Sequence, residues 1–126
     1  MSGLIEFEII NEVIIVAKVS GSIHEQETNS FYSDFRKLVL EQPGRFAIVM
    51  ELSEFEGTSP EGFKQAELFN QWLLDKPIIA KVNVVNSGIM QSIVNKEIPT
   101  RQKLNLKDFN TLQQAVEYLM PLFDEN

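Results

Sequence analysis

The apolar residues of the chain follow the period of a strand in some segments and that of a helix in others. Ile5, Phe7 and Ile9 alternate with two glutamates, which is the period of a half-buried strand. Asn11 and Glu12 then form a plausible hairpin turn. Later runs are continuously apolar, as in strands that are covered on both faces. The five predicted strands are residues 5–9, 13–19, 46–52, 78–85 and 103–106.

Four further segments carry the pattern and the end signals of helices. Ser22 and Glu25 have the spacing of a capping box and open a predicted helix that runs to about residue 41. Ser59 and Pro60 are predicted as the N-cap and the first residue of a helix that ends near residue 75. A short helix is predicted over residues 89–96. The last helix begins after a cap at Asn110 or Asp108 and runs close to the C-terminus.

The resulting order is β-β-α-β-α-β-α-β-α, in which strands and helices alternate after an initial hairpin. Such an order predicts right-handed crossovers and parallel strands, with one antiparallel strand from the hairpin. We therefore expect a single α/β domain over residues 1–126, with a mixed, mostly parallel five-stranded sheet and four helices. Ligands of such sheets bind beyond the carboxyl ends of the strands, which here are residues 51–59 and 86–89.

Composition excludes several classes of chemistry. The 126 residues carry a net charge of −7, which is the wrong sign for a general nucleic-acid binder. The chain has no cysteine and a single histidine, His24, so thiol catalysis, zinc–thiolate sites and most histidine metal sites are absent. The acidic residues 51, 54 and 56 match no specific metal cage. We predict no enzymatic activity, no metal and no cofactor.

Charge is unevenly distributed along the chain. The net charge of residues 1–75 is −8, whereas that of residues 76–107 is +5. A basic segment is therefore expected in a protein whose overall charge is negative. The longest apolar run is only five residues, and the first residues lack the pattern of a secretion signal. These features predict a cytoplasmic protein, with peripheral membrane association as a further prediction.

The chain resembles the SpoIIAA-like family of STAS/SEC14-type domains in the order of three stretches. These are the strand–glycine–cap step at residues 19–22, the apolar strand and acidic–aromatic loop at residues 49–57, and the closing helix with its aromatic at residues 115–119. The likeness implies the STAS/CRAL-TRIO-like fold, which anti-sigma-factor antagonists share and lipid-carrying SEC14 domains share more distantly.

The antagonists are phosphorylated on a serine at the start of their second helix. In this chain the matching position falls on Pro60 or Glu61, so the resemblance does not carry the switch over directly. Thr58 and Ser59 are the nearby hydroxyls and are the candidate phosphorylation sites. Ser59 is better explained as a helix cap, which contributes about 1 kcal/mol.

The predicted helix over residues 60–75 has more apolar surface than one packed face requires. Its apolar arc spans about 240°, whereas packing on one side needs a stripe of about 100°. Two phenylalanines and the only tryptophan of the chain lie in this arc. Packing between the sheet and a neighbouring helix, together with a homodimer interface, would account for the arc. Contact with a ligand or a membrane would account for it as well.

The segment 89–96 adds apolar side chains next to basic ones, which is typical of contact with an anionic membrane surface. The same two helices could form the walls of an apolar pocket. We predict a non-enzymatic protein that binds a lipophilic small ligand or a membrane surface. The predicted contact residues are Phe63, Ala66, Phe69, Trp72, Leu73, Ile89, Met90, Ile93, Lys96 and Arg101. The alternative is a regulatory protein–protein module of the anti-sigma-factor-antagonist type, recognised around Thr58 and Ser59.

Overall fold

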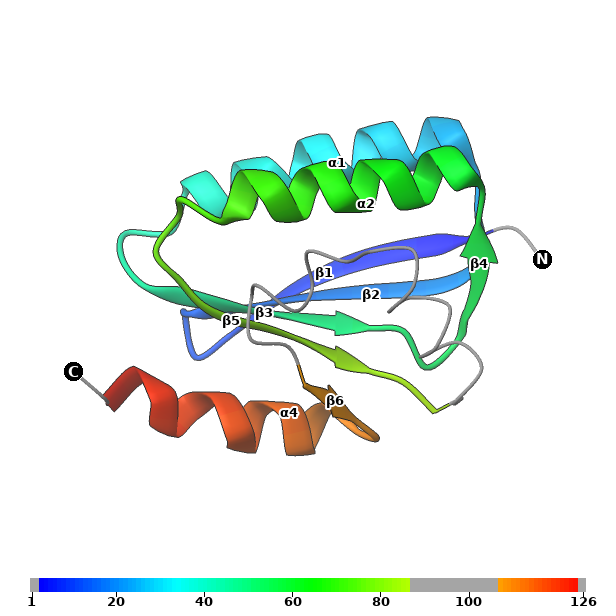
Figure 1. The fold of residues 1–126 in the computed structure, drawn as a ribbon. Coiled ribbons are helices and arrows are strands. Elements are labelled where there is room, and N and C mark those ends of the chain that lie inside the picture. The colour runs from blue at the N-terminus through cyan, green and yellow to red at the C-terminus, as the bar shows by residue number, and fades with distance from the viewer. Residues whose placement is uncertain (1–2, 87–106, 125–126) are drawn as a thin grey trace.

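The structure, a computed structural model, describes residues 3–86 and 107–124. A mixed six-stranded sheet lies at its centre, with the order β1-β2-β3-β5-β6, and β4 pairs with β2 away from this path. Helices α1 and α2 lie side by side on one face of the sheet, and α4 covers the other face (Figure 1). The elements are β1 (Leu4–Ile10), β2 (Ile14–Ile23), α1 (Glu25–Leu40), β3 (Phe46–Glu51), β4 (Phe55–Thr58), α2 (Pro60–Leu73), β5 (Ile78–Val84), β6 (Asp108–Phe109), α4 (Leu112–Leu119) and a 3₁₀ helix (Met120–Asp124).

The predicted α/β architecture is confirmed, and so is the antiparallel hairpin at its start. β1 pairs antiparallel with β2, while β2–β3, β3–β5 and β5–β6 are parallel pairs. The hairpin turn is closed by the Val13 N–H, which donates to the Ile10 carbonyl at 3.2 Å. Asn11 and Glu12 both have positive φ angles, 52° and 65°, as the tight turn of a two-stranded hairpin requires.

Two of the predicted helix starts are wrong by a few residues. α1 is preceded by His24 rather than Ser22, and the His24 backbone N–H donates to Glu27 Oε1 at 3.1 Å. The strand continues to Ile23 because residues 21–23 pair with β4, so the chain reaches its helix later than the capping pattern predicted. α4 is capped by Thr111, whose hydroxyl accepts from the Gln114 N–H at 3.2 Å. The cap of α2 at Ser59 is confirmed.

The number of strands also differs from the prediction. The acidic–aromatic loop expected after the third strand contains β4, which adds a strand to the edge near the start of α2. Tertiary pairing with the end of β2 decides this, because four residues without alternating burial carry little strand signal of their own. The predicted helix 89–96 and the predicted strand 103–106 lie outside the described residues. Within the part of the chain that is described, three α-helices are present.

The core has two layers, one on each face of the sheet. The larger layer lies under α1 and α2 and includes the fully buried Phe35, Phe46 and Phe69. The smaller layer lies between the sheet and α4, and Ala115 and Leu119 are its fully buried helix residues. Because both faces of β3 are covered, the continuous apolar run of this strand is explained. The larger layer is the one that contains the candidate site.

Candidate functional site

A cavity of about 70 Å³ lies between α1, α2 and the sheet. Its walls come from six elements, so it is a product of tertiary packing rather than of one local motif. Most of the lining is apolar, and the α1–α2 side of the sheet is its floor. The lining residues are Val19, Ile23, Thr28, Phe31, Tyr32, Met50, Leu52, Phe55, Thr58, Gly62, Phe63, Ala66, Lys81 and Asn83.

Three polar side chains of the lining are almost completely buried. Thr28 is 3 % exposed, Lys81 is 5 % exposed and Asn83 is 3 % exposed. Lys81 and Asn83 are two residues apart on β5 and therefore lie on the same face of the sheet. The Lys81 ammonium donates to the Oδ1 atom of Asn70 on α2, which is fully buried. A buried cation thus contacts the helix that forms one wall of the cavity.

The N-terminus of α2 is held by hydroxyl groups next to the cavity. The Ser59 hydroxyl accepts from the Gly62 N–H at 3.1 Å, and the Thr58 hydroxyl donates to the Ile23 carbonyl at 2.9 Å. A Cβ atom added to Gly62 would collide with the Thr58 side chain. This close approach explains the glycine, because only a residue without a side chain lets α2 approach β4 so closely. Both candidate phosphorylation residues therefore have structural hydrogen bonds.

Tyr32 lies on α1 and forms part of the cavity wall. Burial raises the pKa of its hydroxyl well above the ordinary value, and the nearby Arg36 guanidinium lowers this pKa by a smaller amount. Its ring packs against Phe69 with a centroid separation of 5.1 Å. Tyr32 is consequently neutral in the folded protein over the whole physiological pH range.

This buried tyrosine predicts a loss of stability in alkali. Above about pH 10 an unfolded tyrosine releases its proton, whereas folded Tyr32 keeps it. The unfolded state then binds fewer protons than the folded state, so the free energy of unfolding falls as pH rises. We expect Tyr32→Phe to remove up to about 1.4 kcal/mol of this loss per pH unit. Urea unfolding of both proteins at pH 8, 10 and 11 measures it; equal slopes above pH 10 would contradict the prediction.

The structure separates the predicted contact residues of α2 into three groups. Phe63 is half-buried and Ala66 is buried, and both line the cavity. Phe69 and Leu73 are fully buried in the core. They are packing residues, and their positions give no support to the predicted contact with a ligand or membrane. Trp72 is half-buried and lies outside the cavity lining. The remaining predicted residues, Ile89, Met90, Ile93, Lys96 and Arg101, lie outside the described part of the chain.

Trp72 lies at the α1–α2 contact rather than facing open solvent. Its ring lies 5.7 Å from that of Phe69, and the Arg36 guanidinium lies 5.7 Å from its centroid. The Lys76 ammonium lies 4.4 Å from the same ring and donates to Asp75 Oδ1 at 2.7 Å. This hydrogen bond and the positive charge lower the pKa of the exposed Asp75 carboxyl. Contacts inside one protomer therefore explain why Trp72 contributes to the wide apolar arc of α2.

The buried polar residues of this layer were not predicted from the sequence. Asn70, Lys81 and Asn83 sit in segments that we interpreted only as an apolar helix and a buried strand. One signal was available, because Lys81 and Asn83 occur at alternate positions within an otherwise apolar run and so share a face. The contact of Lys81 with Asn70 on α2 could not be inferred, since the two residues are eleven positions apart and meet only when the helix packs on the sheet.

Other kinds of site find no support among the described residues. No group of three or more histidine, cysteine, aspartate or glutamate side chains within residues 3–86 and 107–124 is arranged to hold a metal ion. In the same residues, no helix has both the length and the apolar character needed to cross a bilayer. A larger hollow of about 650 Å³ lies on the α4 side, and half of its lining residues are exposed and polar, among them Glu6, Glu8 and Lys18.

Comparison with known proteins bears on the fold alone. No family model and no curated protein matches the chain. Among solved structures, an uncharacterised DUF3478-family protein from Shewanella loihica PV-4, described as having a SpoIIAA-like fold, superposes with a TM-score of 0.68 at 11 % identity, over 94 % of both chains. This chain has a SpoIIAA-like fold. The likeness expected from the order of the sequence motifs is therefore confirmed at the level of architecture.

Two structures of the anti-sigma factor antagonist SpoIIAA show the same SpoIIAA-like fold. The unphosphorylated form matches with a TM-score of 0.67 and 8 % identity, over 92 % of this chain and 97 % of the other. The phosphorylated form from Bacillus matches with a TM-score of 0.65 and 11 % identity, over 92 % and 99 %. Identities this low show a shared SpoIIAA-like fold and carry no residue roles between the chains.

Proposed function

We propose that this SpoIIAA-like chain is a non-enzymatic binding protein that takes a small lipophilic ligand in the cavity between α1, α2 and the sheet. The observation that carries the proposal is the lining itself, an apolar wall with a few buried polar groups. Phe31, Phe55 and Phe63 supply aromatic surface, while Thr28 and Lys81 supply polar atoms. Sites for small molecules combine an apolar lining with a small number of converging polar groups in this way.

The size of the cavity limits the ligand. A single water needs roughly 10–15 Å³ by a comparable measure, and an engineered apolar cavity of about 150 Å³ binds benzene. The cavity of about 70 Å³ lies between these values. We therefore propose a ligand that inserts a short or branched group of a few carbon atoms. A longer lipid would insert only its end unless α2 moved away from the sheet.

The proposal is tested by titration with small probes. In ¹H–¹³C NMR spectra, isobutyrate and 1-butanol are expected to give saturable shifts of the Val19, Ile23 and Met50 methyl groups. Ala66→Leu fills the cavity from α2 and should abolish these shifts, while Ala47→Val on the opposite face serves as a control of similar type. Melting temperatures verify that both variants fold. Shifts that do not saturate, or that survive in Ala66→Leu, would overturn the proposal.

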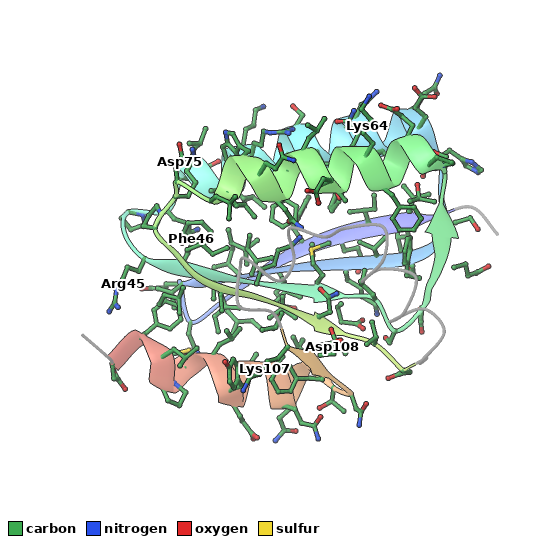
Figure 2. The ribbon with its side chains drawn as sticks, viewed as in Figure 1. Arg45, Phe46, Lys64, Asp75, Lys107 and Asp108 are labelled. Carbon is green, nitrogen blue, oxygen red and sulfur yellow. The ribbon has the colours of Figure 1, made fainter. Side chains whose placement is uncertain are left out.

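A membrane surface is the other form of this proposal, and α2 offers some support for it. Leu68 is 42 % exposed and Leu74 is 44 % exposed, and Lys64 projects away from the sheet (Figure 2). Trp72 is the single tryptophan of the chain, so its fluorescence reports on this helix alone. A blue shift on adding vesicles of phosphatidylserine and phosphatidylcholine, without cavity methyl shifts, would favour the membrane over the small ligand.

A regulatory protein–protein module is the second candidate, and its support is the likeness of the fold to the two SpoIIAA structures. The hydroxyls of Thr58 and Ser59 lie at the start of α2, close to Glu56 and Glu61. A phosphate at Ser59 would place acceptor oxygens at the N-terminus of α2 and would add negative charge next to these acids. Phosphopeptide analysis of protein from its native cell tests this candidate; an unmodified peptide spanning both hydroxyls counts against it.

A further inference from the structure

β1 forms one edge of the sheet, and its outer side is not paired by any strand among the described residues. Its seven residues pair with β2 alone, over the full register from Leu4–Ser20 to Ile10–Ile14. An unpaired edge of this length presents backbone N–H and C=O groups at the spacing that another strand needs. Leu4 and Ile9 on this edge are 57 % and 41 % exposed. The edge therefore has both backbone and apolar groups available for pairing.

A groove of about 520 Å³ runs beside this edge, between β1 and α1. Its base contains Ile5 and Phe7, which are only half-buried, and Phe31 of α1. The rings of Phe7 and Phe31 stack with their centroids 5.4 Å apart. A strand added to β1 would place every second side chain into this groove, because successive side chains of a strand alternate between faces. The groove thus selects apolar residues at alternate positions of the added strand.

Charge determines what the other positions of the added strand must be. Glu6 and Glu8 are exposed and lie on the opposite face of β1, two residues apart; Glu6 is opposite Lys18 of β2, whereas Glu8 is opposite the neutral Val16. Glu27 and Asp34 are among the nine residues that line the groove, and none of the nine is basic. Directly opposite residues of neighbouring strands approach within about 5 Å, so opposite charges there stabilise pairing and like charges oppose it. The edge therefore selects lysine or arginine between the apolar residues.

The same charges oppose pairing of two copies of this chain through β1. In an antiparallel β1–β1 pair centred on Phe7, each glutamate faces a glutamate of the other copy. A parallel pair in register gives the same result. Natural sheets use charged residues on edge strands to prevent association of this kind.

We infer that β1 is a docking edge for an extended segment of a partner protein in which apolar and basic residues alternate. The segment extends the sheet by one strand, inserts its apolar side chains between β1 and α1, and pairs its basic side chains with Glu6 and Glu8. Backbone hydrogen bonds supply affinity in this mode of recognition, and alternate side-chain positions supply specificity. The groove and the cavity use different residues of the sheet, and Phe31 of α1 is the one residue that lines both.

The probe is a capped seven-residue peptide in which lysine and valine alternate. NMR titration of the full chain is expected to shift the backbone amides of β1 and of the first turns of α1. A peptide of the same composition with its valines placed together, and a peptide alternating glutamate and valine, are expected to bind at least about tenfold more weakly. Binding of the lysine–valine peptide should weaken at 0.5 M NaCl, because exposed charge pairs are screened.

Two matched variants test the role of charge. Glu8→Lys lies opposite the neutral Val16 on β2, with Lys18 as its diagonal neighbour on the same face, so its melting temperature is compared with that of the native chain. It should weaken binding of the lysine–valine peptide at least about fivefold and strengthen binding of the glutamate–valine peptide. Glu56→Lys makes the same change at an exposed position on β4 and should alter both affinities less than about twofold. Neither variant should change the cavity titration with isobutyrate.

Three results would overturn the inference. The first is absence of saturable binding of the lysine–valine peptide at millimolar concentration. The second is binding whose shifts lie outside β1 and α1, or which Glu8→Lys leaves unchanged. The third is a sedimentation-velocity dimer of the free chain whose β1 amides are protected from hydrogen exchange, because the edge would then be filled by a second copy.

Discussion

Phe69→Ala is expected to lower the free energy of unfolding by about 3–5 kcal/mol, because it empties a fully buried aromatic site. Phe69 has no exposed surface and packs against three rings, those of Phe35, Tyr32 and Trp72. These contacts join α1 to α2 above the sheet, and a cavity there cannot close without moving a helix. The loss is measured by urea or guanidinium unfolding monitored by circular dichroism.

Leu68→Ala is the matched control for this prediction. Leu68 precedes Phe69 on α2 but is 42 % exposed, so its truncation should cost less than about 1 kcal/mol. The two losses together test which face of α2 is packed. If Phe69→Ala cost less than Leu68→Ala, the helix would be rotated relative to this structure, and the aromatic arc would be free for a ligand or membrane.

Asn70→Leu is expected to destabilise the protein by about 1.5–3 kcal/mol, the usual contribution of a hydrogen bond to a charged group. The substitution keeps the number and branching of side-chain heavy atoms and removes one acceptor of the buried Lys81 ammonium. Lys81→Met should cost about 1–3 kcal/mol, because it leaves the Asn70 carbonyl oxygen without this donor. Unfolding measurements on both single variants and on the double variant complete the comparison.

The double variant Asn70→Leu with Lys81→Met should be at least about 1 kcal/mol more stable than the sum of the single losses predicts. Replacing both members of a buried polar pair by apolar residues removes the need for either to be hydrogen-bonded. Within the described residues, Asn70 Nδ2 has no hydrogen-bond partner, which adds to the expected recovery. Additive losses would show that the two side chains do not depend on each other.

Patterns with a local cause were predicted closely. The cap of α2 was predicted from two consecutive residues, Ser59 and Pro60, and in the structure the Gly62 N–H donates to the Ser59 hydroxyl. The continuous apolar run from Phe46 predicts a strand covered on both faces, and the two core layers cover it. The α1 start was mispredicted because pairing of β2 with β4 extends the strand through Ser22. The segments that form this pairing are more than thirty residues apart, so the local spacing of residues around Ser22 could not predict it.

The candidate site was predicted less well than the fold. Helical spacing assigned Phe63, Phe69 and Trp72 to one apolar arc and could not say which of them the core would take. The position of α1 decides this, since Phe69 lies under α1, Trp72 lies beside Arg36, and Phe63 lies at the cavity. The apolar arc of α2 is wider than one packed face because it packs against two partners, the sheet and α1.

Periodicity, caps and composition are local or additive properties, so they were enough to predict the alternating α/β order apart from β4 and to exclude cysteine chemistry, while the SpoIIAA-like fold was expected from the family resemblance. Only the tertiary structure decided that β4 pairs with β2, that Lys81 meets Asn70 beneath α2, and that a small cavity remains between the helices and the sheet. A cavity or a buried polar contact depends on how side chains from distant parts of the chain pack together. No single residue specifies this packing.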